Sequence, residues 1–562
     1  MLNPINSKTK FDDDAFYFIP LGGSEQFGVN LNTYVADGEI LAVDCGLGFA
    51  DERFPGIDLL LPNPDFLEER QDALQALIIT HAHEDHIGAV SRLWKRLKCP
   101  IYTLEFTAEI LRKKLEEAGL RKVPIIVVEP NEHVQIGAFK VQFVPVAHSI
   151  PDACALVIET AHGRVVHSGD WNLDPNPMTG FPTDSAPFKA AGDAGVLAYV
   201  GDSTNAEVGG RAGSERDVEI GLEKEFKNCD GRIVVTIFSS NIGRVISIIR
   251  AAKKCGREVG VIGRSLHRMV GAAQHCGYMD DVPDLVSEEQ LGFLPNDKVV
   301  IIATGSQGEF RSALARISRG DHRSVSLNKG DTVIFSSREI PGNERHINMV
   351  KNNLTAANIN ILTPRDTENT IHVSGHPCRD EIADMLSWVR PQVIVPVHGE
   401  RAQLDAHARF ARDCQVNKTI VPVNGSVIKL APGKPETVDH VETGLLAVDM
   451  KRIIPADHQS IVARRKLQYT GAVHVSLVVD ERGELLGEVQ INTLGLIDEK
   501  SDTELEIEDN LYEEILSLLD DMKWEDRQDD DLIAERLRIG ARRFVSNTLG
   551  IKPKTTIHVL RV

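Results

Sequence analysis

The sequence predicts a multidomain α/β protein: a first α/β domain, a doubly wound parallel domain inserted into it, and a small α+β domain at the C-terminus. Three observations predict this class. The chain of 562 residues is too long for one hydrophobic core. Its N-terminal third alternates apolar strands with turns and helices, and from about Arg211 the rhythm changes to strand, loop and helix. Hydrophobic residues at 42% and charged residues at 26% are ordinary for a folded globular protein.

The first domain is expected to contain large sheets with helices packed on them. Its expected strands, with the polar turns that end them, lie in the segments 31–36, 39–46, 76–86, 100–104, 124–130, 140–149, 153–160, 164–172 and 196–206. Short strands ending in polar loops return at 371–377, 393–400 and 426–433, as if the same domain resumed. We therefore expect one domain in two parts, residues 1–210 and 366–432.

Between these parts, residues 211–365 repeat a strand, loop and helix pattern, which is typical of a parallel, doubly wound domain. Its strands, with the loops that follow them, are expected in the segments 232–241, 258–265, 298–309 and 331–339. The segment 433–458 begins with a proline-containing stretch and is predicted to be a linker. Residues 459–562 complete the chain as an α+β domain, with strands at 472–479, 487–491 and 555–562 and helices at 511–522 and 531–550.

The net charge of −20 disfavours a protein that holds nucleic acid by bulk electrostatics, because phosphate contacts need lysine and arginine. Much of the excess is local. Between Asp498 and Asp531 there are 16 acidic residues against Lys500, Lys523 and Arg527, a balance of −13. The net charge therefore does not exclude a nucleic-acid-binding groove elsewhere in the chain.

The chain has no run of 18 apolar residues and no signal-peptide pattern at its start, so we expect a cytoplasmic protein without a membrane partner. Its eight cysteines show no CxxC spacing, which favours reduced thiols.

The segment THAHEDHIG follows an apolar strand and places His81, His83, Asp85 and His86 within six residues. Imidazole and carboxylate at this density suit divalent metals, above all zinc. Because the side chains of an extended HxH pair share one side while the following turn redirects the next two, we expect two ions. Further ligand candidates stand at the ends of strands that are distant in the sequence. They are His148, Asp170 and His398.

These motifs, together with the strand residue Asp44, resemble the metallo-β-lactamase superfamily. GDSTNAE, IHVSGHP and PVHGE resemble its β-CASP branch, and GIDLLLPN, FSSNIGRV, ATGSQGE and IPGNE make the chain similar to the bacterial ribonuclease J family from end to end. The resemblance implies a metallo-β-lactamase αββα sandwich with an inserted β-CASP domain. Ala82 and Trp171 depart from the usual residues of the family, but neither change removes a ligand.

The resemblance also implies roles for individual residues. His81, His83 and His148 hold one metal, Asp85, His86 and His398 hold the other, Asp170 bridges both, and Asp44 orients the site. Zinc is the first expectation, with manganese or magnesium as alternatives. His372 is expected to protonate the leaving oxygen, with Asp202 nearby to orient it.

Substrate contacts are expected at two places. Ser374, Gly375 and His376 form a stretch whose donors suit a phosphate. Ser240 and Arg264 follow strands of the inserted domain, where ligands of open α/β sheets collect, and Arg244, Arg338 and Arg345 are further basic candidates for a channel.

The resemblance implies a metal-dependent ribonuclease that digests 5′-monophosphorylated single-stranded RNA from the 5′ end, with some endonuclease activity, in RNA processing and decay. Three alternatives stay open: a small-molecule metallohydrolase, a DNA-processing nuclease of the β-CASP branch, and a poorly active RNA-binding scaffold subunit. The C-terminal domain is expected to join copies of the chain into a homodimer or homotetramer.

Overall fold

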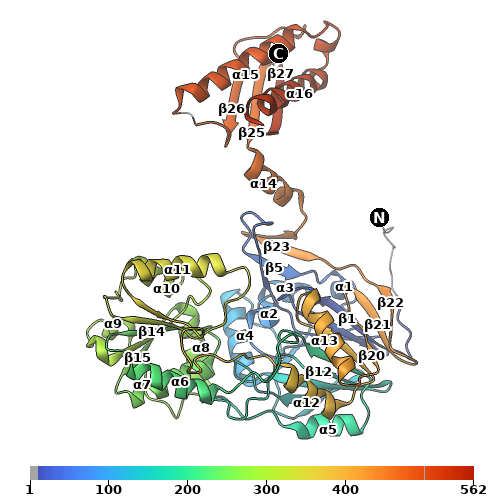
Figure 1. Cartoon of the computed structure of the whole chain (residues 1–562). Helices are drawn as coiled ribbons and strands as arrows, with labels where there is room; N and C mark the ends of the chain where they lie inside the picture. The colour runs from blue at the N-terminus through green and yellow to red at the C-terminus, as the bar shows by residue number, and fades with distance from the viewer. Residues whose placement is uncertain (1–9, 499) are drawn as a thin grey trace. The chain divides into compact units, whose positions relative to one another are not determined.

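The computed structural model describes residues 10–498 and 500–562, so the first nine residues of the predicted domain 1–210 lie outside it. The chain forms two units (Figure 1). Unit 1 comprises the residues up to Gly48 and Leu61–Leu445, and unit 2 comprises Phe49–Leu60 and Leu446–Val562. Among the described residues, no helix is long and apolar enough to cross a membrane.

Unit 1 is built around two large sheets. The eight-stranded sheet has the order β22-β21-β1-β2-β3-β6-β7-β8. Its strands are β1 (Phe16–Gly22), β2 (Leu31–Ala36), β3 (Glu39–Val43), β6 (Leu74–Ile78), β7 (Ile101–Thr103), β8 (Ile125–Val127), β21 (Ser426–Ala431) and β22 (Glu436–His440). The seven-stranded sheet has the order β20-β19-β13-β12-β11-β10-β9. Its strands are β9 (His133–Ile136), β10 (Phe139–Pro145), β11 (Cys154–Thr160), β12 (Gly163–His167), β13 (Ala198–Asp202), β19 (Val393–Val397) and β20 (Lys418–Thr419).

One apolar core joins the two sheets. Phe16, Tyr34 and Ile78 of the first sheet pack in the same cluster as Leu156 and Val395 of the second. Helices cover the outer faces, so the central strands β1, β2, β13 and β19 are buried along their whole length, whereas the edge strands β8, β9 and β22 have exposed residues. The helices are α1 (Asp65–Glu68), α2 (Glu84–Ile87), α3 (Val90–Leu97), α4 (Glu105–Glu117), α5 (Ser185–Asp193), α12 (Arg379–Val389) and α13 (Arg401–Asp413).

The inserted domain leaves the seven-stranded sheet after β13 and returns to it at β19, which pairs with β13 in parallel. Its own sheet is wholly parallel, with the order β15-β16-β14-β17-β18. The strands are β14 (Ile233–Thr236), β15 (Glu258–Ile262), β16 (Val299–Ala303), β17 (Thr332–Phe335) and β18 (Asn360–Leu362). The helices are α6 (Glu215–Lys227), α7 (Ile242–Lys254), α8 (Arg264–His275), α9 (Glu288–Leu291), α10 (Ala313–Arg319) and α11 (Glu344–Ala356).

Two segments differ from expectation. Residues 371–377 form a loop instead of a strand, because side chains take their backbone carbonyls: Ser336 donates to Ile371 O at 2.6 Å and His148 to Gly375 O at 2.7 Å. The segment 433–458, expected as a linker, contains β22, β23 (Leu445–Asp449) and β24 (Arg452–Pro455). Every residue of β22 is exposed, so the alternation that marks a strand is missing from its sequence.

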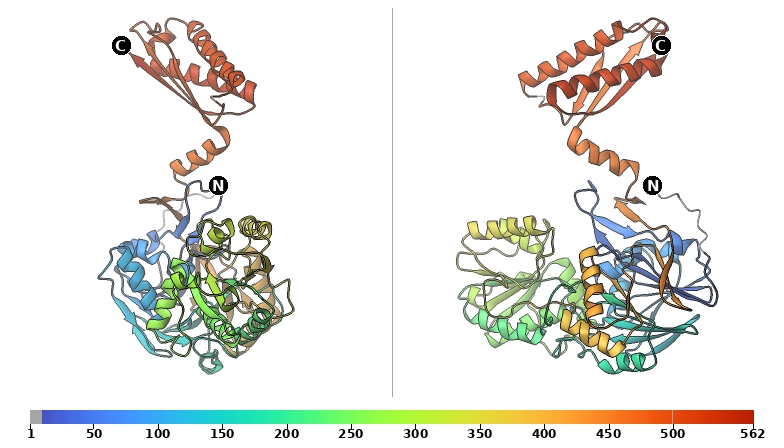
Figure 2. Two further views of the ribbon diagram at one scale, coloured as in Figure 1. Left: turned by 90° about the vertical axis from the view of Figure 1, so that its left-hand side faces the viewer. Right: turned by 45° about the vertical axis from the view of Figure 1, so that its right-hand side comes forward.

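Unit 2 contains the C-terminal α+β domain, seen from two further sides in Figure 2. A three-stranded sheet of order β26-β25-β27 carries α15 and α16 on one face, with Val473, Val475 and Leu477 of β25 packed against Leu511 and Leu537 of the helices. Its elements are α14 (Gln459–Thr470), β25 (Ala472–Val479), β26 (Gln490–Leu494), α15 (Asp502–Asp520), α16 (Asp530–Leu549) and β27 (Lys554–Arg561). The unit also holds β24 and most of β23, in a sheet of order β24-β23-β5-β4 with β4 (Gly48–Phe49) and β5 (Leu59–Pro62).

The core of unit 2 gives a stability prediction. Leu537→Ala removes a side chain that is fully buried between α16 and the sheet, and it should lower the free energy of unfolding of this unit by about 2–5 kcal/mol. Leu532→Ala, on the same helix but with the side chain 48% exposed, should cost less than about 0.5 kcal/mol. Calorimetric unfolding of the full chain would compare them, and equal losses would contradict the packing.

Candidate metal centre

The candidate site lies where strands of both large sheets end. Asp44 follows β3, the motif from His81 to His86 follows β6, and His148 follows β10. Asp170 comes after β12, Asp202 ends β13 and His398 follows β19. Asp44 and His398 have positive φ angles of 62° and 57°, a conformation that non-glycine residues rarely adopt and that is common at functional sites.

Three groups of histidine and aspartate converge there, with ligand atoms within 4.8 Å of one another in each group. The first is His81, His83, His148 and Asp170. The second is Asp85, His86, Asp170 and His398. The third is Asp170, Asp202, His376 and His398. Asp170 is common to all three, which fits a carboxylate between two cations.

The nitrogen atoms of the first group point at one another. His83 Nδ1 lies 3.0 Å from His81 Nε2 and 3.1 Å from His148 Nε2. Burial lowers the pKa of His83 to about 4 and that of His148 to about 3, and it holds the pKa of His81 well below its usual value. The rings are therefore neutral at pH 7 and turn lone pairs toward a common point, as a cation requires.

The second group is rich in charge. Burial lowers the pKa of His86, but Asp170, Asp85 and Asp44 beside it raise that pKa well above its usual value. Burial raises the pKa of Asp170, yet His398 and His86 hold it below its ordinary range. Buried carboxylates at these distances need positive partners, so the donor set fits a divalent cation.

Neighbouring groups orient these ligands. His86 Nδ1 contacts Asp44 Oδ2 at 2.8 Å, and the Asp44 carboxylate accepts from the backbone N–H of Thr80 at 2.8 Å. His148 Nδ1 donates to Gly375 O at 2.7 Å. Such bonds fix ring orientation at metal sites.

A cleft adjoins His148 and the loop of residues 373–375. It is lined by Ala147, His148, Ser149, Asn172, Asp174, Pro177, Met178, Thr179, Glu215, Asn241, Gly243, Val373, Ser374 and Gly375. A Cβ on Gly375 would lie 2.8 Å from Ser149 Oγ and 3.0 Å from His148 Cε1, so only glycine fits beside the histidine. Ser374 and Gly375 therefore lie directly beside His148.

The expected pairing of Asp202 with His372 needs correction. Asp202 Oδ2 lies 2.8 Å from His376 Nδ1, whereas His372 Nδ1 faces the guanidinium of Arg244 at 3.3 Å. The HVSGH motif curls back as a loop, and it is the second histidine that reaches Asp202. Burial, with the charges of Arg244 and Arg338, lowers the pKa of His372 to about 3.

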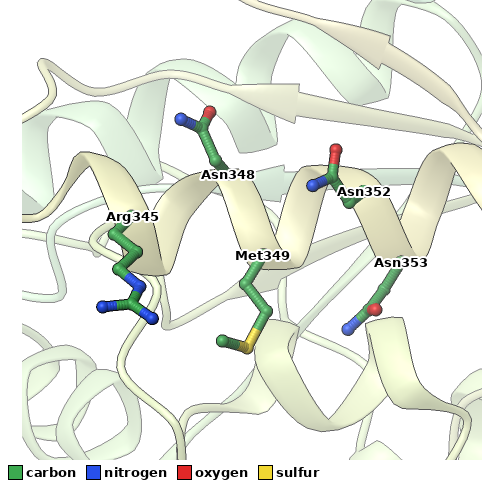
Figure 3. A pocket seen from close by; sticks show the side chains of 5 residues that line it. All are labelled: Arg345, Asn348, Met349, Asn352 and Asn353. Carbon is green, nitrogen blue, oxygen red and sulfur yellow. The ribbon is translucent and has the colours of Figure 1, made fainter.

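The structure places the basic residues that were expected to line a channel in different parts of the inserted domain. Arg244 is fully buried and paired with Glu215 at 2.7 Å, so it does not line a channel. Ser240 and Arg264 do follow the carboxyl ends of β14 and β15, but the cleft next to His148 is lined by Asn241 and Gly243 instead. Arg345 lies on α11, where it lines a separate open hollow with Asn348, Met349, Asn352 and Asn353 (Figure 3).

Sequence reasoning missed two polar residues after Asp202. Thr204 Oγ1 donates to Asp202 Oδ1 at 2.7 Å and contacts His398 Nδ1 at 2.9 Å. Asn205 is buried and donates to Ser374 Oγ at 2.9 Å and to His376 O at 3.1 Å. Their position within the strand-end motif GDSTNAE was the signal that pointed to them.

The contact between Asp44 and His86 gives a prediction about metal affinity. Asp44→Asn removes the charge that orients and polarises the His86 ring, so it should weaken divalent-metal binding about 10- to 100-fold. Asp37→Asn is a matched control, since Asp37 makes the same contact with His162 at the surface, at 2.7 Å. Competition with a metal chelator would measure both affinities. If the Asp44→Asn and Asp37→Asn variants bound the metal equally tightly, Asp44 would not contribute to metal binding.

Family models match almost the whole chain. "Metallo-beta-lactamase superfamily" matches residues 28–206 and "Ribonuclease J, beta-CASP domain" matches 230–354. "Zn-dependent metallo-hydrolase RNA specificity domain" matches 366–422, and "Ribonuclease J C-terminal domain" matches 460–562. The predicted fold class, a metallo-β-lactamase domain with an inserted β-CASP domain and a C-terminal domain, is confirmed.

Several proteins with similar sequences are named ribonuclease J. Ribonuclease J of Sinorhizobium meliloti is 42% identical over 98% of both chains. Ribonuclease J of Mycolicibacterium smegmatis is 38% identical over 82% of both chains, and that of Thermus thermophilus is 36% identical over 83% of both. A crystal structure of a protein of unknown function from Enterococcus faecalis shares the fold, with a TM-score of 0.52 and 17% identity over 74% of this chain and 100% of that one. With its full-length similarity and its metal centre at the ends of the two sheets, this chain belongs to the ribonuclease J family.

Proposed function

We propose that this chain is a metal-dependent ribonuclease that hydrolyses RNA phosphodiester bonds, removing nucleotides in the 5′-to-3′ direction from 5′-monophosphorylated RNA and also cutting internally. One observation carries the proposal: Asp170 is shared by adjoining groups of metal-ligand side chains, and the cleft beside them is lined by Ser374 and Gly375. A site for divalent cations thus adjoins a site for an anion. We place its action in the cytoplasm, in RNA decay and ribosomal RNA processing, on the strength of family membership.

The ligand roles follow the grouping of the side chains. His81, His83 and His148 would hold one ion. Asp85, His86 and His398 would hold the second, with Asp170 between them. Zinc suits the nitrogen-rich first group best, with manganese or magnesium as alternatives for the more carboxylate-rich second group. When bound, such a pair of ions lowers the pKa of a water molecule and clamps the oxygens of an in-line displacement.

The residues of the chain itself would position the substrate and move a proton. Ser374 and Gly375 would hold the 5′-terminal phosphate in the cleft. His376, paired with Asp202 at 2.8 Å and close to Asp170 and His398, is better placed than His372 to protonate the leaving 3′ oxygen. Arg264 and Ser240, at strand ends of the inserted domain, would contact RNA farther from the reacting bond.

The activity can be tested on single-stranded RNA and DNA that carry a 5′-monophosphate, a 5′-triphosphate or a 5′-hydroxyl, with Mn²⁺, Mg²⁺ or Zn²⁺. The wild-type chain should release mononucleotides from 5′-monophosphorylated RNA. His83→Ala or Asp85→Ala should reduce the rate more than about 100-fold, because each removes a direct metal ligand. His162→Ala, a histidine that pairs with Asp37 outside the centre, should leave the rate unchanged.

The products also separate the alternatives. Equal digestion of DNA would favour a DNA-processing β-CASP nuclease, and RNA binding without cleavage would favour a scaffold subunit. Hydrolysis confined to small esters or β-lactams would contradict both nuclease functions.

We also propose that the C-terminal domain joins copies of the chain into a dimer or tetramer. The sheet of this domain carries its helices on one face, and Leu494 and Leu560 are 56% and 57% exposed. Leu494 pairs with Ala472 and Leu560 with Val478, two positions of β25 that share the face opposite the helices. Exposed leucines on one sheet face favour an interface between copies.

Sedimentation of the full chain would test this assembly. The double substitution Leu494→Asp and Leu560→Asp should convert the assembly to monomers, because it places charges in the proposed interface. Leu532→Asp, on the helical side of the same domain, should leave the assembly state unchanged. A wild-type chain that sediments as a monomer, or a double variant that stays assembled, would refute the interface.

A further inference from the structure

The loop 372–374 lies near two arginines of the inserted domain. The first of them, Arg244, determines which nitrogen of the neutral His372 ring carries the proton. Arg244 is fully buried on α7, and its Nη2 and Nε atoms donate to the Glu215 carboxylate at 2.7 and 2.8 Å. Its Nη1 atom donates to Ser336 O at 2.8 Å and to Ser336 Oγ at 2.7 Å, and it faces His372 Nδ1 at 3.3 Å. A guanidinium has no acceptor, so the His372 nitrogen that faces it must carry the lone pair. In the neutral ring the proton then sits on Nε2, which becomes a donor.

The second arginine fixes the hydroxyl of Ser374 through an amide. Arg338 Nη1 donates to Asn205 Oδ1 at 2.7 Å, which turns the Asn205 amide nitrogen toward Ser374 Oγ at 2.9 Å. Ser374 Oγ also accepts from the backbone N–H of His376 at 3.1 Å. Both lone pairs of the hydroxyl oxygen are therefore used, and its own hydrogen is the remaining bonding group.

We propose that Arg244 and Arg338 are positioning residues that make this loop a donor surface for the 5′-terminal phosphate of RNA, by occupying the acceptor atoms of His372 and Ser374. The phosphate would accept hydrogen bonds from the Ser374 hydroxyl, which lines the cleft beside His148. His372, two residues earlier in the same loop but not among the residues that line the cleft, would donate from Nε2. Acceptor atoms turned toward the ligand would repel an anion, so removing them from the surface selects phosphate over a 5′-hydroxyl. This inference rests on the proposed function for its substrate.

A double-mutant cycle tests whether Arg338 acts through Ser374. Arg338→Gln should raise the KM for 5′-monophosphorylated RNA about tenfold, the effect of losing one hydrogen bond to a charged group, with little change in kcat or in the KM for 5′-hydroxyl RNA. In a Ser374→Ala background the same substitution should have no further effect. Arg323→Gln, which removes an 81% exposed guanidinium of the same domain, is the control for charge. A role in folding alone would instead change both RNAs alike and persist in the Ser374→Ala background.

A pair of substitutions at His372 tests the proposed role of Arg244, which makes His372 Nε2 the donor. Arg244 itself is too deeply buried to replace without risk to folding. His372→Gln keeps an amide nitrogen near the position of Nε2 and should retain most of the preference for 5′-monophosphorylated RNA. His372→Asn places its amide near the position of Nδ1 and should lose that preference. Equal behaviour of the two variants would overturn the assignment of Nε2 as the donor.

Binding of uridine 5′-monophosphate and of uridine, measured by calorimetry on the metal-loaded chain, separates this inference from the proposed function because it needs no turnover. Tighter binding of the monophosphate that weakens about tenfold in Arg338→Gln would support the inference even if the chain did not cut RNA. A chain that cuts 5′-monophosphorylated RNA but binds the monophosphate equally well with and without Arg338 would overturn the inference and leave the function standing. The inference also fails if the chain binds uridine and its monophosphate alike.

Discussion

The carboxylate of Asp170 is the constraint on which the rest of the centre depends. It lies 3.2 Å from His86 Nε2, 3.6 Å from His81 Nε2 and 3.7 Å from His398 Nδ1, so each group of ligands is arranged around it. The backbone that presents it is specific: Gly169 has a φ of 54°, and a Cβ there would lie 2.9 Å from Cys154 O. Only glycine can place the next residue against the ends of both sheets. The packing of two sheets and the chemistry of the centre are thus joined at one turn.

The inserted domain and the metal centre are coupled through the order of the strands. The chain leaves after Asp202 on β13 and returns to β19, the adjacent parallel strand, so the insertion begins and ends at the centre. The returning segment carries His372, Ser374 and His376 past that edge. Two contacts tie the loop of residues 371–377 to the centre: His148 Nδ1 donates to Gly375 O at 2.7 Å, and His376 Nδ1 lies 2.8 Å from Asp202 Oδ2. A substrate held by the loop would therefore lie at a fixed distance from cations bound at the centre, as in-line displacement requires.

The sequence revealed the candidate ligands that stand at strand ends, because an apolar run followed by histidine or aspartate can be recognised without knowing the fold. His81, Asp170 and His398 were found in this way. Contacts that depend on how a loop curls could not be predicted. The motif HVSGH holds two histidines, and only the three-dimensional path of the loop places His376, and not His372, against Asp202. Arg244 likewise looked like a channel residue, since sequence cannot show that Glu215 neutralises its charge in the interior.

The difference between overall charge and individually oriented hydrogen-bond donors explains how a chain with a net charge of −20 could recognise RNA. Much of the negative charge lies between Asp498 and Asp531, in α15, the start of α16 and the turn between them, which belong to unit 2. The cleft belongs to unit 1, and the phosphate contacts proposed there would come from neutral donors such as the Ser374 hydroxyl. Neutral donors release no counterions, and the two arginines behind them act on donor geometry instead of on the bulk potential. Recognition of this kind needs few cations in total, because hydrogen-bond networks that include the buried Arg244 and Asn205 would orient the donors.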